Sequence, residues 1–322
     1  MRKIKLFLLW AVVLTAGCTC PLRSLGITPQ DPAATHQVPA FTVPATKPGA
    51  AYERFIVVGD MGTGRRGQKA VAAAMAKRAA ADGVDFILST GDNIYDDGVK
   101  SAEDRQWKTK FEDIYAAPSL QVPFFATLGN HDHYGNEQAQ VEYAARNKLW
   151  RMPAFYYSFV RTLADGSKVQ FFAIDTEPIN QGQADAAGQL AWLDGELGKS
   201  DARWKIVFGH HPPYGHNPSR GHNRVLIEKL EPILVKHKAD IYFAGHDHTL
   251  EMLKPVKGVN YVISGAGAAG DNAYRVEWTD ESYYVATLGG FVLCRISADE
   301  LVIEFVRLDG RTQYAHVLKK SP

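Results

Sequence analysis

The stretch from Arg54 to Asp92, RFIVVGDMGTGRRGQKAVAAAMAKRAAADGVDFILSTGD, decides the fold. It opens with a short apolar, β-branched run that ends at Gly59-Asp60, and it closes with a second apolar run that ends at Gly91-Asp92. Between the two runs lies an alanine-rich segment of helical composition, Gln68 to Ala81, and Gly83 follows where a helix commonly ends. Strand, helix and strand in this order indicate a β-α-β unit with parallel strands.

Further apolar runs along the chain end in the same way, at a polar residue. They are PFFATLGN ending at Asn130, QFFAID at Asp175, WKIVFGH at His210 and IYFAGH at His246. The polar residues therefore follow the C-terminal ends of strands, which is the edge where ligands bind in α/β sheets. From Val259 onward strands dominate, in NYVISGAG, YYVATL, GGFVLCRIS and LVIEFVRL. We find no repeat or linker after residue 51 and expect one α/β domain over residues 52–322.

Residues 1–18 have the pattern of an export signal. Three basic residues precede an apolar run from Leu6 to Thr15, which has the length of a signal-sequence core and is short for a bilayer span. The run leads into LTAGC, which resembles a bacterial lipobox, so Cys18 would become the lipidated first residue of a protein facing the periplasm or the exterior. Thr15 stands where leucine is commoner. Ordinary secretion as a soluble protein and a retained membrane anchor are the rival interpretations.

The rest of the composition limits the possible partners. Residues 19–51 are rich in proline, alanine and threonine, which is typical of a semi-extended linker. Of the three cysteines, Cys18, Cys20 and Cys294, only the last lies in the folded part, so we expect no disulfide there. The 36 basic and 35 acidic residues leave a net charge of +1, which gives no field to attract nucleic acid. We expect a monomer that meets a membrane only through a lipidated N-terminus.

The loops after the strands concentrate side chains that bind metals. A lone aspartate after a strand is usually a turn former or a helix cap, and a lone buried histidine is usually a core residue. Here five strand ends carry such residues, and eight of the eleven histidines fall in three loops. Carboxylate, amide oxygen and neutral imidazole are donors for hard and borderline cations. The loop residues in question are Asp60, Asp92, Asn130, His210, His246 and His248.

The order of these motifs resembles the calcineurin-like metallophosphoesterase superfamily, and in particular its purple acid phosphatases of the small, tartrate-resistant type. The motifs are GDMG (59–62), GDNIY (91–95), GNHDH (129–133), VFGH (207–210) and GHDH (245–248). Most relatives begin with Asp-x-His, whereas Asp60 here lacks that histidine and Tyr95 stands three residues after Asp92, which selects the branch. The resemblance runs from about residue 54 to the end. It implies a four-layer α/β sandwich, with two mixed sheets face to face, helices outside and a dinuclear metal site on strand-end loops.

The resemblance also implies a ligand set and a reaction. The ligands would be Asp60, Tyr95 and His248 for Fe(III), Asn130, His210 and His246 for a divalent ion (Fe(II), Zn or Mn), and Asp92 as the bridge. Phenolate and carboxylate are hard anions suited to Fe(III), and an amide oxygen with two imidazoles suits the divalent ions. Two ions about 3.5–4 Å apart clamp a phosphoryl group and generate hydroxide. The implied reaction is hydrolysis of phosphate monoesters, on small molecules or phosphoproteins, by metal-bound hydroxide at acidic pH.

Residues beside the ligands receive catalytic roles from the same resemblance. In the family the histidine that follows the asparagine ligand faces the substrate, which assigns His131 to protonating the leaving-group oxygen. We expect Asp132 to orient His131 through a hydrogen bond that favours its charged form. Another histidine often helps to bind phosphate. His216 and His222 are both candidates in the loop after His210, and spacing does not choose between them.

The remaining signals have structural interpretations. We expect His133 at the rim of the pocket and His211 behind the ligands. The segment GAGAAG (265–270) matches a dinucleotide fingerprint, but no amphipathic helix follows it, so it is predicted to be a tight loop. The aromatic run FYYSF (155–159) is predicted to be strand core or pocket wall.

Other functions fit the same motifs. A phosphodiesterase or a nucleotide pyrophosphatase would keep the metal site, since the walls of the pocket decide the substrate class. A surface binding lipoprotein with a vestigial site belongs to another class, and redox chemistry by the iron pair would be a side activity. The complete ligand set favours hydrolysis of phosphate monoesters.

Overall fold

The computed structural model describes residues 52–268, 276 and 279–320. Its strands are β1 (Glu53–Val58), β2 (Phe86–Ser89), β3 (Phe124–Ala126), β4 (Trp150–Arg151), β5 (Tyr157–Thr162), β6 (Lys168–Ala173), β7 (Trp204–Phe208), β8 (Ile241–Ala244), β9 (Leu250–Leu253), β10 (Asn260–Ser264), β11 (Ser282–Ala286), β12 (Gly290–Ile296), β13 (Glu300–Arg307) and β14 (Thr312–Lys319). Its helices are α1 (Arg66–Asp82), α2 (Arg105–Trp107), α3 (Gln138–Tyr143), α4 (Thr176–Asn180), α5 (Ala186–Lys199), α6 (Arg224–Lys229) and α7 (Glu231–Lys236), with short turns at Lys108–Glu112, Pro118–Leu120 and Asp132–Tyr134.

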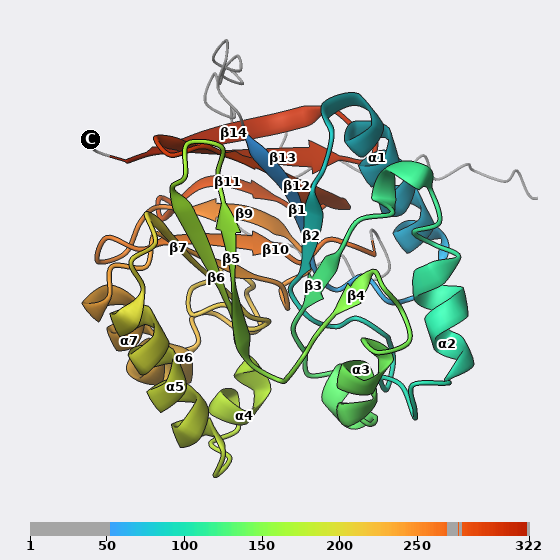
Figure 1. Ribbon diagram of the computed structural model, residues 1–322, viewed down its shortest axis with the longest axis horizontal. Helices are drawn as coiled ribbons and strands as arrows, with labels where there is room; N and C mark the ends of the chain where they lie inside the picture. The colour runs from blue at the N-terminus through green and yellow to red at the C-terminus, as the bar shows by residue number, and fades with distance from the viewer. Residues whose placement is uncertain (1–51, 269–275, 277–278, 321–322) are drawn as a thin grey trace, which may run out of the picture.

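The strands form two seven-stranded sheets, both mixed. The first sheet has the order β14-β13-β12-β1-β2-β3-β4 and the second β11-β9-β10-β8-β7-β6-β5. In the first sheet β1, β2, β3 and β4 run parallel, and in the second β6, β7, β8 and β10 do so. Helices α4–α7 lie on one side of the pair of sheets and α1–α3 on the other (Figure 1). This arrangement confirms the expected α/β sandwich of two mixed sheets flanked by helices.

The opening β-α-β unit has the predicted form. Strand β1 pairs in parallel with β2, and α1 between them ends at Gly83, whose φ of 78° is the left-handed conformation that glycine tolerates. The outer strands β4 and β14 and the antiparallel strand β9 were not among the predicted runs. Strands β4 and β9 are short, and β14 mixes polar and apolar residues, so composition alone did not mark them.

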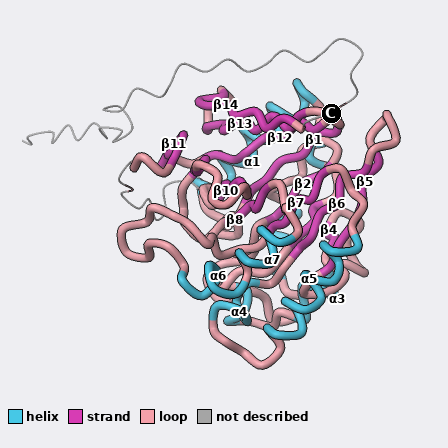
Figure 2. Tube along the Cα trace, turned by 90° about the vertical axis from the view of Figure 1, so that its left-hand side faces the viewer, coloured by secondary structure: helices cyan, strands magenta, loops and turns pink. Residues whose placement is uncertain are grey.

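Aromatic side chains join the two sheets at the centre of the core. Phe55 of β1 stacks on Phe86 of β2 with the ring centroids 5.1 Å apart, and Phe171 of β6 meets Phe55 edge to face at 5.5 Å. All three rings are fully buried, and burial of such a side chain stabilises the fold by about 1.5–3 kcal/mol. A second apolar cluster packs helices α4–α7 on the outer face of the second sheet. The chain trace, turned by 90°, shows strands of both sheets above these helices (Figure 2).

Two glycines of the 265–270 segment have a packing role. A Cβ on Gly265 would lie 2.1 Å from the Asp247 carbonyl oxygen, and one on Gly267 would lie 2.4 Å from that of Gly59. Glycine is therefore required for backbone contact with two ligand loops, as expected of a tight loop; its continuation, residues 269–275, lies outside the described residues. Within the described residues no helix combines the length and the apolar character needed to cross a membrane.

Candidate metal centre

Both sheets contribute loops to one cluster of polar side chains. Asp60 follows β1, Asp92 and Tyr95 follow β2, and Asn130 follows β3, all in the first sheet. His210 follows β7, and His246 and His248 follow β8, in the second sheet. These strands are parallel within each sheet, so their C-terminal ends meet at one edge. The structure therefore brings all seven candidate ligands together.

Three of these side chains surround the phenol oxygen of Tyr95. Tyr95 Oη lies 3.1 Å from Asp60 Oδ1, 2.8 Å from Asp92 Oδ2 and 3.2 Å from His248 Nε2. Burial, and then the charges of Asp60 and Asp92, raise the pKa of Tyr95 well above its usual range. Burial opposes ionisation of Asp60 too, but the imidazoles of His248 and His210 and the backbone N–H of His246 outweigh it and lower the pKa of Asp60. A buried group of one phenol oxygen and two carboxylates fits a highly charged cation.

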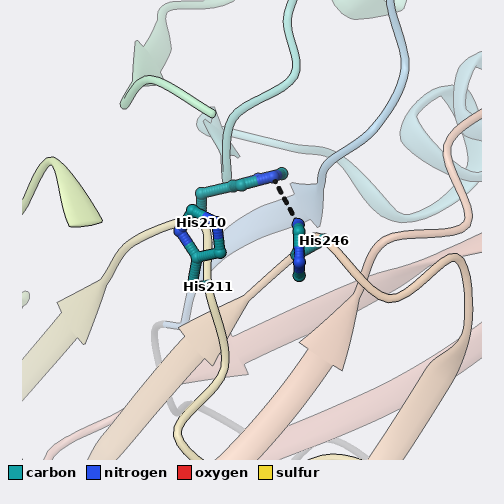
Figure 3. A group of neighbouring side chains, drawn as sticks. All are labelled: His210, His211 and His246. Atoms are coloured by element: carbon teal, nitrogen blue, oxygen red, sulfur yellow. Dashed lines mark hydrogen bonds between the residues drawn. The ribbon is translucent and has the colours of Figure 1, made fainter. Parts of the chain in front are cut away.

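The other ligands converge on the amide oxygen of Asn130. Asn130 Oδ1 lies 3.1 Å from His210 Nε2 and 3.1 Å from His246 Nδ1, and these two nitrogens are 3.2 Å apart, as the dashed line in Figure 3 marks. His210 Nδ1 lies 2.8 Å from the Thr90 carbonyl oxygen and donates to it, which leaves Nε2 as the lone-pair nitrogen. Burial, and then the neighbouring imidazoles, lower the pKa of His246 well below its usual value. Imidazole nitrogens and an amide oxygen fit a divalent ion.

Asp92 connects the two groups. Its Oδ2 accepts the hydrogen bond from Tyr95, and its Oδ1 lies 3.5 Å from His210 Nε2. The two carboxylate oxygens thus point to opposite groups, as a bridging ligand requires.

The backbone is strained where the ligands sit. Asp60, Asp92 and His246 have φ values of 56°, 51° and 67°, in the left-handed region that non-glycine residues seldom adopt. Each such residue costs about 1–3 kcal/mol, and these conformations cluster at functional sites. With these conformations the chain turns sharply after each strand, and the side chain of the ligand residue points into the centre.

His131 stands at the outer side of the cluster. Its backbone N–H donates to Asp92 Oδ1 at 3.0 Å, and its ring lies 4.6 Å from the ring of Tyr95. His131 Nδ1 lies 2.6 Å from the carbonyl oxygen of Asp96 and donates to it. The ring is therefore held through Nδ1, and Nε2 is the nitrogen available to a substrate.

The expected role of Asp132 is corrected by its contacts. Its carboxylate is fully buried and accepts from the backbone N–H of Asn93, Ile94 and Gly129 at 3.0, 3.2 and 2.9 Å, and from Gln140 Nε2 at 2.7 Å. None of its contacts is with His131, which takes the Asp96 carbonyl as its partner. Asp132 points away from the substrate side because it ties the loop after β2 to the loop after β3.

The two histidines considered for phosphate binding lie elsewhere as well. His216 Nδ1 is 3.1 Å from Glu251 and its Nε2 is 3.2 Å from Glu281, which also lies 3.4 Å from His222 Nε2. Within the described residues neither imidazole contacts a candidate ligand. The carboxylates of Glu251 and Glu281 contact these rings, and the role of either histidine in phosphate binding stays a prediction.

Arg220, between these two histidines in the sequence, is the residue that the sequence analysis missed. Its Nη1 donates to the His246 carbonyl oxygen and to Asp247 Oδ1, the latter at 3.1 Å. Its charge also lowers the pKa values of His246 and His211, secondary to burial, so the guanidinium lies near the imidazoles. A basic residue in a loop beside a ligand motif was the only signal that could have identified it.

His211 and His133 lie beside the candidate ligands, and each contacts a residue that follows β6. His211 Nδ1 lies 2.8 Å from Thr176 Oγ1, and its ring is 4.3 Å from the ring of His246, as Figure 3 illustrates. Its nitrogens lie close enough to those of His210 and His246 to form a possible metal-binding group. His133 Nε2 lies 2.9 Å from Asp175 Oδ2 after β6, so it links the two sheets.

The fold and the site define a metallophosphoesterase. The model of the calcineurin-like phosphoesterase family matches residues 53–250, and the chain belongs to that family. Rabbit (Oryctolagus cuniculus) tartrate-resistant acid phosphatase type 5 is 33% identical over 83% of this chain and 91% of its own length. Purple acid phosphatase 3 of Arabidopsis thaliana is 35% identical over 83% of this chain and 77% of its own. Within the family, the chain belongs to the branch of tartrate-resistant and purple acid phosphatases.

Solved structures share the fold. The protein described as GAP50, the anchor in the inner membrane complex of Plasmodium, superposes with a TM-score of 0.77 and 27% identity over 84% of this chain and 90% of its own. Purple acid phosphatase PPD1 of yellow lupin (Lupinus luteus) gives a TM-score of 0.66 and 19% identity over 84% and 54%, which bears on the fold alone.

Proposed function

We propose that the protein is an acid phosphatase that hydrolyses phosphate monoesters at a dinuclear metal centre. The observation that carries the proposal is the convergence of seven donor side chains into two groups that share Asp92. Relatives named as acid phosphatases, 33% and 35% identical over 83% of the chain, support the same reaction.

The donor chemistry supports an assignment of the two metal sites. We assign Asp60, Tyr95 and His248 to Fe(III), Asn130, His210 and His246 to Fe(II), Zn or Mn, and Asp92 to both ions. Phenolate and carboxylate oxygens are hard donors, which suits Fe(III). When bound, the two ions clamp the phosphoryl oxygens and supply the hydroxide nucleophile.

Two residues of the chain would act on the substrate directly. His131 donates a proton to the leaving-group oxygen from Nε2, while Nδ1–H stays on the Asp96 carbonyl. Arg220 supplies a permanent positive charge at the turn that carries His246 and His248, and it takes the phosphate-binding role first expected of His216 or His222.

The function is tested by comparing three substrates: an aryl monoester, an alkyl monoester and an aryl diester. We expect the parent to hydrolyse both monoesters in preference to the diester. We expect His131→Ala to lose about 10²–10⁴-fold in kcat on the alkyl ester, whose leaving group needs a proton, and less on the aryl ester. A loss that is equal for both monoesters removes His131 from the acid role.

The same comparison separates the rival functions. Preference for the diester would favour a phosphodiesterase or a nucleotide pyrophosphatase. The likeness to the Plasmodium protein described as an anchor favours a second candidate, a binding protein that has lost catalysis. Absence of all hydrolysis in fully metallated parent would favour that candidate.

The location of the protein also remains a proposal. The N-terminal residues that carry the export pattern and the linker lie outside the described residues. We infer an exported protein that Cys18 anchors to the membrane, supported by the LTAGC sequence. Fractionation of the cells tests this: sedimentation with membranes and release by detergent support lipidation, and recovery in the soluble extract contradicts it.

A further inference from the structure

Residues 95–98, in the loop after β2, connect the metal ligands with the proposed proton donor. Tyr95 supplies the phenol oxygen that lies among the candidate Fe(III) ligands. The carbonyl oxygen of the next residue, Asp96, accepts the hydrogen bond from His131 Nδ1 at 2.6 Å. A shift of segment 95–98 would therefore move a metal ligand and the proton donor together.

Two side chains from α2 and the turn at Lys108–Glu112 hold the backbone of segment 95–98. The ammonium group of Lys110 donates to the carbonyl oxygen of Tyr95, and Gln106 Nε2 donates to that of Gly98 at 2.8 Å. Lys110 Nζ also donates to Gln106 Oε1 at 2.6 Å, so the two side chains support each other. Together they fix the first and the last carbonyl group of the segment.

Lys110 is itself fixed at its base. Its backbone carbonyl accepts from Nε2 of the fully buried Gln68 at 2.7 Å, and Gln68 Oε1 accepts from the Gly64 N–H at 2.7 Å. A Cβ on Gly64 would lie 3.1 Å from Lys110 Cγ, so the stem of the lysine packs on the loop after β1. The next residue, Phe111, is buried and meets Trp150 edge to face at 5.1 Å. The ammonium group therefore projects from a well-held backbone.

We propose that Lys110 is a positioning residue of the metal centre, which holds segment 95–98 so that the Tyr95 phenol reaches the metal and the His131 ring keeps its orientation. Lys110 is half-buried, and its hydrogen bond to the Tyr95 carbonyl is charge-assisted, hence stronger than a neutral one. Because the ammonium group binds the backbone, Lys110 acts through Tyr95 and Asp96. The inference rests on the proposed phosphatase function and adds to it a residue outside the ligand motifs.

The test uses the full chain loaded with its metals and compares Lys110→Met with the parent. Methionine keeps an unbranched apolar stem but cannot donate a hydrogen bond. We expect the purple band of the Tyr95 phenolate to lose intensity per bound iron, because the phenol is no longer held towards the metal.

Steady-state kinetics on an alkyl and an aryl monoester gives the second readout. We expect kcat of Lys110→Met for the alkyl ester to fall about ten- to hundredfold, the size of effect that a displacement of about 1 Å produces, with KM little changed. The fall should be smaller for the aryl ester, whose leaving group depends less on the proton from His131.

Three further variants identify the cause. Lys108→Met removes a lysine of the same turn that pairs with Asp113 at the surface, and it should change neither the band nor kcat. Lys110→Arg keeps the charge and the donors, so it should restore most of the band and of kcat. Gln106→Leu removes the second side chain that holds the segment, and it should change both readouts in the same direction as Lys110→Met.

A band and rates like those of the parent, in Lys110→Met at full iron content, would overturn the proposal. So would an equal fall of kcat for both esters beside an unchanged band, which is the result of a general structural effect. If Lys110→Met does not fold or loses its iron, Gln106→Leu is judged by the same two results. A parent that hydrolyses neither ester contradicts the proposed function instead. A parent that hydrolyses both without a purple band contradicts the Fe(III) assignment, and the dependence of kcat on the leaving group then decides for Lys110.

Discussion

At the scale of single residues, four consecutive side chains contact different parts of the protein: Asn130, His131, Asp132 and His133. Asn130 faces two imidazoles, and His131 binds the Asp96 carbonyl at the substrate side. Asp132 turns into the protein, and His133 reaches Asp175 across the site. Because the segment begins a 3-10 turn, successive side chains point in different directions. Each role therefore depends on the direction of the side chain rather than on its chemical type.

Arg220 leads to a prediction at this scale. A charge-assisted hydrogen bond to a phosphoryl oxygen contributes about 1.5–3 kcal/mol, so we expect Arg220→Gln to raise KM for phosphate esters roughly ten- to hundredfold. The inhibition constant for inorganic phosphate should rise in parallel, since the product binds the same charge. Steady-state kinetics with metal content measured on the same samples checks this.

Two variants serve as controls for Arg220. Arg224→Gln removes an exposed arginine four residues further along and should leave both constants unchanged. Arg220→Lys keeps the charge and should give an intermediate value. Phosphate inhibition that is unaltered in Arg220→Gln at normal metal content would show that the guanidinium does not bind the phosphoryl group.

The sequence placed the seven candidate ligands in motifs that the structure brings together, but it did not indicate how the residues around them are directed. Each ligand follows a strand end within a short motif, so the fold alone positions it. The direction of Asp132 could not be predicted because it depends on distant partners, the backbone of residues 93 and 94. The same holds for the contacts of His216 and His222 with Glu251 and Glu281. Arg220 was missed because its approach to His246 depends on how the long loop after β7 closes.

At the scale of elements, close contact between strand-end loops makes the centre possible. A Cβ on Gly91 would lie 2.7 Å from the backbone nitrogen of Gly129 and 2.8 Å from His210 Nδ1, and one on Gly129 would lie 2.2 Å from Asp92 Oδ1. The loops after β2 and β3 therefore touch through glycine, and a larger residue would push the ligands apart.

The stability contributed by the contact between His133, in the loop after β3, and Asp175, at the end of β6, should depend on pH. Burial disfavours the charged form of His133, but the hydrogen bond and charge of Asp175 outweigh it and raise the pKa of His133 above 6.5. Burial also raises the pKa of Asp175, so the folded state binds protons more tightly at both partners. The stability that His133 contributes is thus complete below pH 6.5 and is lost as the pH rises through its folded-state pKa.

We expect His133→Gln to reduce the dependence of Tm on pH between about 6 and 8, since glutamine keeps a hydrogen bond but cannot titrate. Thermal unfolding of parent and variant across this range measures it. His237→Gln is the matched control, because His237 also contacts a carboxylate, Asp194 at 2.7 Å, but that carboxylate is 38% exposed whereas Asp175 is 2% exposed, and exposed ion pairs contribute little. Identical pH profiles for parent and His133→Gln would refute the linkage.

At the scale of the whole molecule, the centre lies where the two sheets meet. The first sheet supplies the aspartates, Tyr95 and Asn130, and the second supplies the three histidines. The α/β class could be predicted from the apolar runs of the central strands, and the sandwich from the family resemblance that the motifs at their ends carry. Strands such as β4, with two residues, could not, because they form only through pairing with a neighbour. Neither metal group is complete without loops from both sheets.

The most direct test of the account is the visible absorption spectrum of the metallated protein beside that of Tyr95→Phe. We expect a purple band in the parent, from charge transfer between the Tyr95 phenolate and Fe(III), and its loss in a variant that still contains iron. That result would place Tyr95 on Fe(III) and support the ligand groups built around it. A parent that contains iron and hydrolyses phosphate esters without the band, or a band that survives in Tyr95→Phe, would contradict the assignment.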